Sequence, residues 1–92
     1  MPDDSQDDLD NVVIYTTDYC SFCTRARRFL NEHKIAFKEI DVGYDRGARE
    51  KMEQLSQRRT VPQIFFGARH IGGYTDLIAW HQRKESPTQP SL

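Results

Sequence analysis

The chain has 92 residues, of which 37% are hydrophobic and 29% charged, and its formal net charge is −1. This length fits one domain, and this composition is too apolar for a chain that is disordered throughout. No run approaches the roughly 18 consecutive apolar residues of a membrane helix, and the acidic first ten residues lack the apolar segment of a secretory signal, so we expect neither.

The charge is unevenly distributed along the chain. Five of the 14 acidic residues lie within the first ten positions, namely Asp3, Asp4, Asp7, Asp8 and Asp10. We expect residues 1–10 to form a disordered leader and residues 85–92 to form a flexible tail. Outside the leader there are 13 basic and nine acidic residues, a net charge of +4. The bases are spread out rather than clustered with aromatic residues, so this charge suits an anionic small molecule better than nucleic acid.

The first half of the expected domain, residues 11–84, alternates strand and helix patterns. Residues 12–15 form a β-branched run that is typical of a buried strand. Over residues 21–33 apolar side chains recur at helical spacing, as Phe22, Ala26, Phe29 and Leu30. Residues 35–42 alternate as a second strand would. A second helix over residues 46–56 is indicated by the spacing of Ala48, Met52 and Leu55.

The second half predicts a hairpin and a last helix. Pro62 opens a third strand over residues 63–66, and a two-residue turn leads to a fourth strand over residues 69–71. The last helix begins at Thr75 and Asp76. In the order β-α-β-α-β-β-α the first two strands are parallel, with a right-handed crossover between them. We therefore expect an α/β fold, a four-stranded mixed sheet flanked by three helices.

The two cysteines, Cys20 and Cys23, stand where the first predicted helix begins. Two thiols exclude a disulfide-dense scaffold and a four-cysteine zinc site. A structural disulfide would close a loop of about four residues and would contribute only about 2 kcal/mol. A zinc site would need two further ligands, and the three histidines are isolated in the sequence, as His33, His70 and His81. Two unreactive buried thiols are a further alternative.

A redox pair is the interpretation that their position favours. A cysteine just before the first turn of a helix faces unpaired backbone N–H groups and the positive end of the helix dipole, which favour the nucleophilic thiolate. The second cysteine, three residues on, lies on the same helix face. We expect Cys20 to attack and Cys23 to resolve the mixed disulfide or to stay a buried thiol. Arg25 and Arg27 either add positive potential or are solvated helix surface.

Three motifs in this chain resemble those of the glutaredoxins. The sequence of residues 20–23 is similar to the family's C-P-Y-C motif, that of residues 60–62 to its T-V-P motif, and that of residues 72–77 to its G-G-x-x-D-L motif. They occur in the family's order and spacing, and the resemblance covers about residues 11–84. The resemblance implies that the chain is a short dithiol glutaredoxin with a thioredoxin-like fold. The implied function is a glutathione-dependent thiol-disulfide oxidoreductase that reduces protein disulfides and glutathione mixed disulfides.

The resemblance also implies roles for individual residues. Cys20 corresponds to the nucleophile that carries the glutathionyl group, and Cys23 to the resolving cysteine. Pro62 corresponds to a proline that follows a cis peptide bond, which would expose the backbone of Val61 to pair with glutathione. The other residues expected to bind glutathione are Thr17, Phe22, Arg59, Thr60, Gly73, Tyr74, Thr75 and Asp76.

The last helix is expected to hold the γ-glutamyl end of glutathione. The backbone N–H groups of Thr75 and Asp76 would bind its carboxylate, and the Asp76 side chain would meet its ammonium group. Thr75 would also cap the helix, and a plain first-turn acid is the alternative for Asp76. Arg59 would lie near the glycyl carboxylate or, alternatively, would be a surface arginine.

The sequence departs from the family pattern at three places. Thr17 stands where the family usually has Lys, Ser21 and Phe22 replace Pro and Tyr, and Tyr74 stands where many relatives carry an extra cysteine. Ser21 would add an N-cap hydroxyl. It is also reminiscent of members that hold a glutathione-ligated 2Fe-2S cluster between two monomers, with Cys20 as ligand.

These departures leave two alternative functions open. The first is an iron–sulfur cluster carrier, with the 2Fe-2S cluster as cofactor. The second is a thioredoxin-like electron donor, which would have Gly-Pro between its cysteines. The favoured expectation is a cytoplasmic monomer that serves electron transport and cell redox homeostasis. Its expected partners are glutathione and disulfide-containing or glutathionylated proteins, with no nucleic acid and no membrane.

Overall fold

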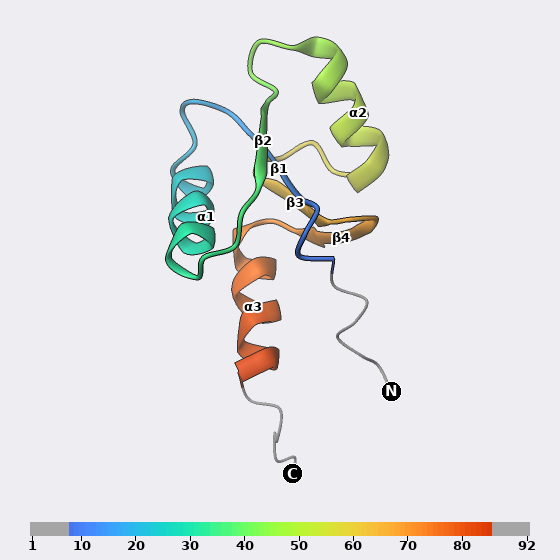
Figure 1. Ribbon diagram of the computed structural model, residues 1–92. Coiled ribbons are helices and arrows are strands. Elements are labelled where there is room, and N and C mark those ends of the chain that lie inside the picture. The colour runs from blue at the N-terminus through green and yellow to red at the C-terminus, as the bar shows by residue number, and fades with distance from the viewer. Residues whose placement is uncertain (1–7, 86–92) are drawn as a thin grey trace.

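The computed structural model describes residues 8–85; most of the expected leader and tail, residues 1–7 and 86–92, lies outside the described residues. Seven elements follow the predicted order β-α-β-α-β-β-α (Figure 1). They are β1 (Val12–Thr16), α1 (Ser21–Glu32), β2 (Lys38–Asp41), α2 (Arg46–Ser56), β3 (Gln63–Phe66), β4 (Arg69–Gly72) and α3 (Tyr74–Glu85). Within residues 8–85, no helix is long and apolar enough to cross a membrane.

The strands form the predicted four-stranded mixed sheet, and their order is β2-β1-β3-β4. β1 pairs in parallel with β2, with Val13 opposite Lys38, and it pairs antiparallel with β3, with Ile14 opposite Ile64. β3 and β4 form the expected antiparallel hairpin. β1 ends at the connection that leads to the cysteines, and β3 begins directly after Pro62. Because the two strands are antiparallel neighbours, with Tyr15 opposite Gln63, the sheet brings these two segments together.

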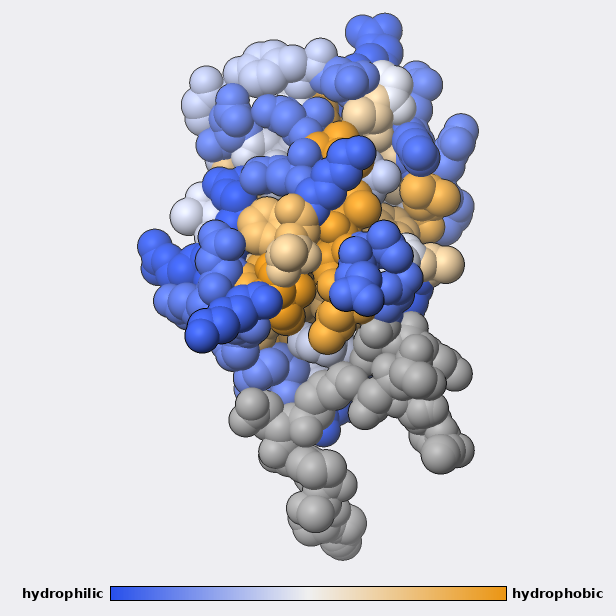
Figure 2. All heavy atoms as spheres, viewed as in Figure 1, coloured by the Kyte–Doolittle hydropathy of each residue, from blue (hydrophilic) through white to orange (hydrophobic). Residues whose placement is uncertain are grey.

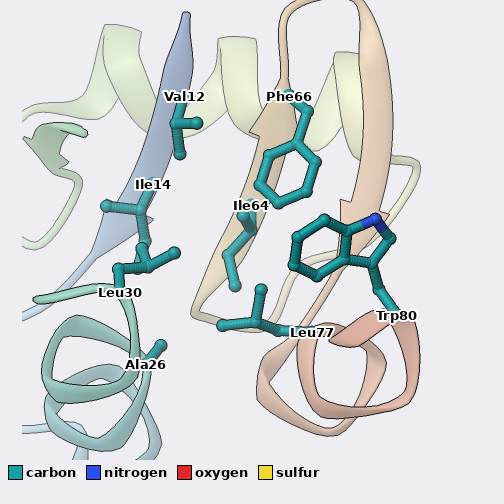
Figure 3. Packing of buried hydrophobic residues seen from close by; sticks show 8 residues of the cluster. All are labelled: Val12, Ile14, Ala26, Leu30, Ile64, Phe66, Leu77 and Trp80. Atoms are coloured by element: carbon teal, nitrogen blue, oxygen red, sulfur yellow. The ribbon is translucent and has the colours of Figure 1, made fainter. Parts of the chain in front are cut away.

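The larger core lies between the sheet and the pair of helices α1 and α3. Alternate residues of β1 and β3 point to this face, because successive side chains of a strand point to opposite sides. They meet Ala26 and Leu30 from α1, and Leu77 and Trp80 from α3 (Figure 3). The Trp80 ring packs edge-on against Phe66, with 4.8 Å between ring centroids. This packing holds both helices against the sheet.

The opposite face of the sheet is covered by α2. Tyr15 and Phe65 point to this side, where their rings meet edge-on at 5.8 Å, and Met52 from α2 completes the cluster together with Val42. In the space-filling view, hydrophobic residues gather in the middle of one face of the molecule and hydrophilic residues surround them (Figure 2). The helices therefore lie on both faces of the sheet, as expected.

Two element boundaries differ from the sequence prediction. The second strand was expected over residues 35–42 but is confined to Lys38–Asp41. The reason is that the N–H of Ile35 donates to the Leu30 carbonyl at 2.9 Å and closes the end of α1. The first residue of β1 that pairs with β2 is Val13, opposite Lys38, so the residues before Lys38 have no strand partner in β1. α3 begins at Tyr74 rather than at Thr75 and Asp76.

The start of α2 is fixed by a side-chain cap. Asp45 has extended backbone angles, and its carboxylate accepts a hydrogen bond of 3.0 Å from the N–H of Ala48. Replacing Asp45 by alanine is expected to lower the free energy of unfolding by about 1 kcal/mol, because an N–H group loses its partner. Urea denaturation would measure the change. Glu50→Ala, on the exposed side of the same helix, is the matched control and should change stability by less than about 0.5 kcal/mol. Equal losses in both variants would contradict the capping role.

Candidate active site

Cys20 occupies the N-cap position of α1. Its backbone is extended, and its sulfur accepts a hydrogen bond of 3.1 Å from the N–H of Cys23. This N–H is one of the donors that a helix start leaves without a backbone partner, so it is suited to stabilise negative charge on the sulfur. Ser21 is the first helical residue and not the cap that the sequence suggested. The sulfur of Cys20 takes the place of the expected hydroxyl.

Cys23 has a very different environment. It is fully buried, whereas Cys20 is partly exposed, and both thiols are free. Burial, together with a hydrogen bond to Cys20, raises the pKa of the Cys23 thiol to about 12. A backbone hydrogen bond from Thr17 and the more distant charge of Arg27 act in the opposite direction. Cys23 is therefore protonated at neutral pH, and the exposed, capped sulfur of Cys20 is the one available for attack.

A cis peptide bond joins Val61 to Pro62, directly opposite Cys20. The Val61 carbonyl lies 3.6 Å from the Cys20 sulfur and accepts its hydrogen bond when the thiol is protonated. Thr60 and Val61 precede β3, which is paired with β1, and this pairing holds the two segments in register. The backbone next to the reactive sulfur is thus an extended segment that a peptide-like ligand could pair with.

A cleft of about 200 Å³ opens beside this pair. Seven of the ten residues expected to bind glutathione line it, namely Phe22, Thr60, Val61, Pro62, Gly73, Tyr74 and Thr75. The rings of Phe22 and Tyr74 lie 6.1 Å apart, and the guanidinium of Arg25 lies 5.3 Å from the centre of the Phe22 ring. Phe22 remains about half exposed. The cleft therefore combines apolar rings with exposed backbone, as ligand sites commonly do.

Asp76 organises the first turn of α3. Its Oδ2 accepts a hydrogen bond of 2.8 Å from the N–H of Gly73, and it lies 3.1 Å from the guanidinium of Arg58. The N–H of Gly73 and the charge of Arg58 hold the pKa of the Asp76 carboxyl below its ordinary value. Asp76 is the third residue of α3, and it accepts the N–H of Gly73, the residue before the helix. This bond is half of a capping box. Thr75, expected as the cap, lies inside the helix instead.

Three predicted residues do not line the cleft. Thr17 lies behind the cysteines, where its backbone bonds to Cys23. Arg59 is exposed, and its carbonyl accepts a hydrogen bond of 2.8 Å from Arg49 of α2. Asp76 lies at the edge of the cleft with Arg58, a residue that the sequence did not single out. The backbone turns at Gln57, which is left-handed, and Arg58 rather than Arg59 pairs with Asp76.

Arg27, whose charge acts on Cys23, is held in an ion pair. The Arg27 guanidinium lies 2.7 Å from Glu39 on β2 and also donates to the Thr24 hydroxyl. Arg27 thus contributes both positive potential at Cys23 and a partly exposed ion pair with the sheet. Across residues 8–85, no group of three or more histidine, cysteine, aspartate or glutamate side chains is arranged to hold a metal ion.

Comparison with known proteins agrees with this geometry. The family described as Glutaredoxin matches residues 12–71 of the chain. Glutaredoxin 3 of Escherichia coli is 44% identical over 73 residues, which cover 79% of this chain and 88% of that protein. The solution structure of a glutaredoxin from Brucella melitensis is 38% identical, with a TM-score of 0.70, and the match covers 83% of this chain and 85% of that one.

A crystal structure of a buckwheat glutaredoxin–glutathione complex is 23% identical, with a TM-score of 0.73, and covers 80% of this chain and 70% of that one. At this identity it supports the thioredoxin-like fold alone. The family match and the bacterial relative carry the assignment further, because both span most of the domain and include the cysteine pair. The chain belongs to the glutaredoxin family, as a dithiol member and a glutathione-dependent disulfide reductase with glutathione as co-substrate.

Proposed function

We propose that Cys20 is the nucleophile of this disulfide reductase, that Cys23 is the resolving thiol, and that the cleft beside them binds glutathione. The observation that carries the proposal is the contrast between the two sulfurs. Cys20 is accessible and accepts a backbone N–H at the start of α1, whereas Cys23 is buried and its pKa is raised to about 12. Only one of the two is suited to begin an exchange reaction at neutral pH.

The monothiol reaction follows from this contrast. The Cys20 thiolate attacks the glutathionyl sulfur of a mixed disulfide, forms a Cys20–glutathione disulfide and releases the substrate's thiolate, which takes up a proton. A second glutathione thiolate then attacks the glutathionyl sulfur, forms oxidised glutathione and regenerates the Cys20 thiolate. Each step exchanges one S–S bond for another, so the direction follows the ratio of reduced to oxidised glutathione.

Protein disulfides would be reduced by a route that uses both thiols. Cys20 forms a mixed disulfide with the protein, and Cys23 then attacks the Cys20 sulfur. The released protein thiolate takes the proton that Cys23 loses, and two glutathione molecules reopen the Cys20–Cys23 disulfide. The hydrogen bond between the two thiols supports this step, because it places them within reach of each other.

The proposed glutathione site has a backbone part and a charged part. The extended backbone of Val61, before Pro62, is suited to pair with the ligand's own peptide groups. At the start of α3, the N–H groups of Thr75 and Asp76 have no partner within the helix and are suited to the γ-glutamyl carboxylate. The bonds from Gly73 and Arg58 go to Oδ2 of Asp76, which leaves Oδ1 for the ligand's ammonium group among the described contacts.

We assign the glycyl carboxylate to the basic residues before Thr60. Arg59 is the residue that the family pattern suggests, and its exposed side chain is free of ion pairs among those given for residues 8–85. Arg58 is paired with Asp76 and would keep that carboxylate ionised and oriented. The expected positive charge at position 17 is lost with Thr17, and Arg59 or Arg27, whose charge acts on Cys23, is the candidate to replace it.

Removal of the Asp76 carboxylate tests the charged part of the site. Asp76→Ala is expected to raise the KM for a glutathione mixed disulfide about tenfold, because a charge-assisted hydrogen bond is lost. The rate at which iodoacetamide alkylates Cys20 should stay unchanged, since that reaction needs no glutathione. Loss of both activities would show that Asp76 supports the fold rather than the ligand.

The titration of Asp76 gives this test a pH dependence with a defined sign. Because its pKa is lowered, the carboxylate is ionised at and above the ordinary range of an aspartate. Its contribution to stability and to binding is therefore complete there, and it is lost only as the pH falls through the lowered pKa. In Asp76→Ala, that loss at acid pH should be missing from the KM profile.

We further propose that the protein acts as a monomer on disulfide-containing and glutathionylated proteins in the cytoplasm. Free thiols and a site for reduced glutathione fit a compartment where glutathione keeps cysteines reduced. Tyr74 stands where many relatives carry an extra cysteine, so dimers linked through that position are not available. An assay with glutathione and glutathione reductase on a glutathionylated protein would test the substrate. Sedimentation of the purified chain would test the monomeric state.

A further inference from the structure

A chain of three hydrogen-bonded side chains and backbone groups runs from β4 to the segment before Pro62. Gln63 is fully buried at the start of β3. Its amide nitrogen donates to the Thr60 carbonyl at 3.0 Å and to the Thr60 hydroxyl at 3.2 Å. Its amide oxygen lies 2.7 Å from Nε2 of His70. Both polar atoms of this buried amide are therefore hydrogen-bonded, as burial of a polar group requires.

The chemistry of the amide fixes the direction of these bonds. The Thr60 carbonyl can only accept, so it must face the NH₂ group of Gln63, and the oxygen of Gln63 must face His70. His70 therefore donates from Nε2. Burial and the charge of Arg58 hold the pKa of His70 below its ordinary value, against the attraction of Asp76, so the ring is neutral near pH 7. Its single N–H is the one that this bond requires.

This series of hydrogen bonds leads to the reacting sulfur. Thr60, which the Gln63 amide holds at two atoms, is joined by one peptide bond to Val61, and the Val61 carbonyl lies 3.6 Å from Sγ of Cys20. Thr60 itself is exposed on its outer side and lines the cleft. Apart from the Gln63 bonds, the hydrogen bonds given for residues 8–85 tie neither the carbonyl nor the hydroxyl of Thr60 to the rest of the fold.

The position of His70 is itself well defined. Its ring packs on Phe65 with 4.8 Å between centroids, and Phe65 belongs to the core beneath α2. The pairing of β3 with β4 places the two residues opposite each other, next to the irregularity between Ile64 and Phe65. His70 thus connects a rigid part of the core to an otherwise weakly held segment of the site.

We propose that His70 is a positioning residue for glutathione, which acts through the Gln63 amide to hold the Thr60–Val61 backbone in its binding conformation. The inference rests on the proposed role of that backbone in binding glutathione. His70 does not line the cleft and bonds to Gln63, so its loss should weaken binding and leave the exchange chemistry largely intact.

Two substitutions separate the donor from the ring. His70→Phe keeps an aromatic ring on Phe65 but has no N–H, and His70→Gln loses the ring but keeps an N–H at similar reach. His70→Phe is expected to raise the KM for a glutathione mixed disulfide about three- to tenfold, the range of one net hydrogen bond. The kcat and the alkylation rate of Cys20 should stay within about twofold of the wild-type values. His70→Gln should restore most of the affinity.

A spectroscopic measurement follows the Gln63 amide directly. In the wild type its two side-chain amide protons are buried and hydrogen-bonded to Thr60, so their ¹H–¹⁵N signals should exchange slowly with water. In His70→Phe these signals should shift and exchange faster, and in His70→Gln they should stay close to the wild-type values. Thermal unfolding of both variants identifies any general loss of stability.

Two results would overturn the inference. An unchanged KM in His70→Phe would show that the segment does not depend on His70, and an equal rise in both variants would show that the ring acts rather than the donor. Asp76→Ala, measured in parallel, separates this failure from that of the glutathione site. If Asp76→Ala raises the KM and His70→Phe does not, only the role of His70 is wrong. If neither raises it, the cleft is not the glutathione site.

Discussion

Replacing Cys20 by serine is expected to lower turnover of a glutathione mixed disulfide at least about a thousandfold, as loss of a covalent nucleophile does in other enzymes. The hydroxyl of serine is not ionised near pH 7 and does not attack sulfur as a thiolate does. The substitution leaves the fold intact, because the partly exposed serine oxygen can still accept the N–H of Cys23 at the start of α1. The measurement is a coupled assay with glutathione, its reductase and a small glutathionylated thiol.

Replacing Cys23 should have a much smaller effect in the same assay, since the monothiol route needs Cys20 and glutathione alone. Cys23→Ser is expected to keep about half of the wild-type turnover or more. Because Cys23 is fully buried, a serine hydroxyl there costs about 1–3 kcal/mol of stability if it finds no partner. Cys23→Ala, which buries no polar group, is therefore measured alongside it.

The same variants separate the two classes of substrate. Reduction of a protein disulfide by the two-thiol route should be strongly impaired in both Cys23 variants, because nothing then resolves the Cys20–protein disulfide except glutathione. An active Cys20→Ser together with an inactive Cys23→Ala would reverse the assigned roles. Equal activity of the Cys23 variants on both substrate classes would show that the buried thiol takes no part in catalysis.

Patterns of apolar residues were sufficient to predict the element order and the sheet. The β-branched run of β1 and the helical spacing in α1 and α2 are local features that tertiary packing preserves, since both faces of the sheet need apolar partners. The C-x-x-C pair could be placed at a helix start for the same reason. Its contrast in burial follows from helix geometry, which turns Cys23 toward the core with Ala26 and Leu30.

The boundaries depended on features that such patterns do not contain. Residues 35–37 alternate like a strand, but the pairing of β1 with β2 begins only at Val13 and Lys38, and Ile35 instead closes α1 and packs on the core. The cap of α1 is a cysteine sulfur and that of α3 is supplied by Asp76 from inside the helix. Propensity scales favour hydroxyl and carboxylate residues at the cap itself, so they pointed to Ser21 and Thr75.

Contacts between distant segments were the part of the site that the sequence did not reveal. The pairing of Arg58 with Asp76 joins residues 18 positions apart, and the bond between Gln63 and His70 joins opposite strands of a hairpin. Gln63 stands before the apolar run of residues 64–66, at a strand end where a glutamine would ordinarily face water. Its complete burial is explained only by the partners that the fold brings to it.

Gly72 is expected to be the residue of the G-G-x-x-D-L motif, residues 72–77, that tolerates substitution least. Its φ of +121° is a conformation that side-chain-bearing residues rarely adopt, which costs about 1–3 kcal/mol. A Cβ atom at position 72 would also overlap the carboxylate of Asp76 and would lie 2.9 Å from the Cβ atom of Asp76. Gly72→Ala should therefore lower the free energy of unfolding by at least about 2 kcal/mol and displace the Asp76 side chain from the Gly73 N–H.

Gly73→Ala is the matched comparison, one residue further along. A Cβ atom at Gly73 would meet the Pro62 carbonyl at 3.6 Å, an ordinary contact, and its backbone needs no left-handed conformation. This variant should keep wild-type stability in urea denaturation but raise the KM for a glutathione mixed disulfide, because the methyl group projects into the cleft that Gly73 lines. Gly72→Ala should lose both stability and affinity. If the two variants had equal free energies of unfolding, the left-handed backbone at position 72 would not require glycine there. Glutathione binding would then depend only on the space that the missing side chains leave.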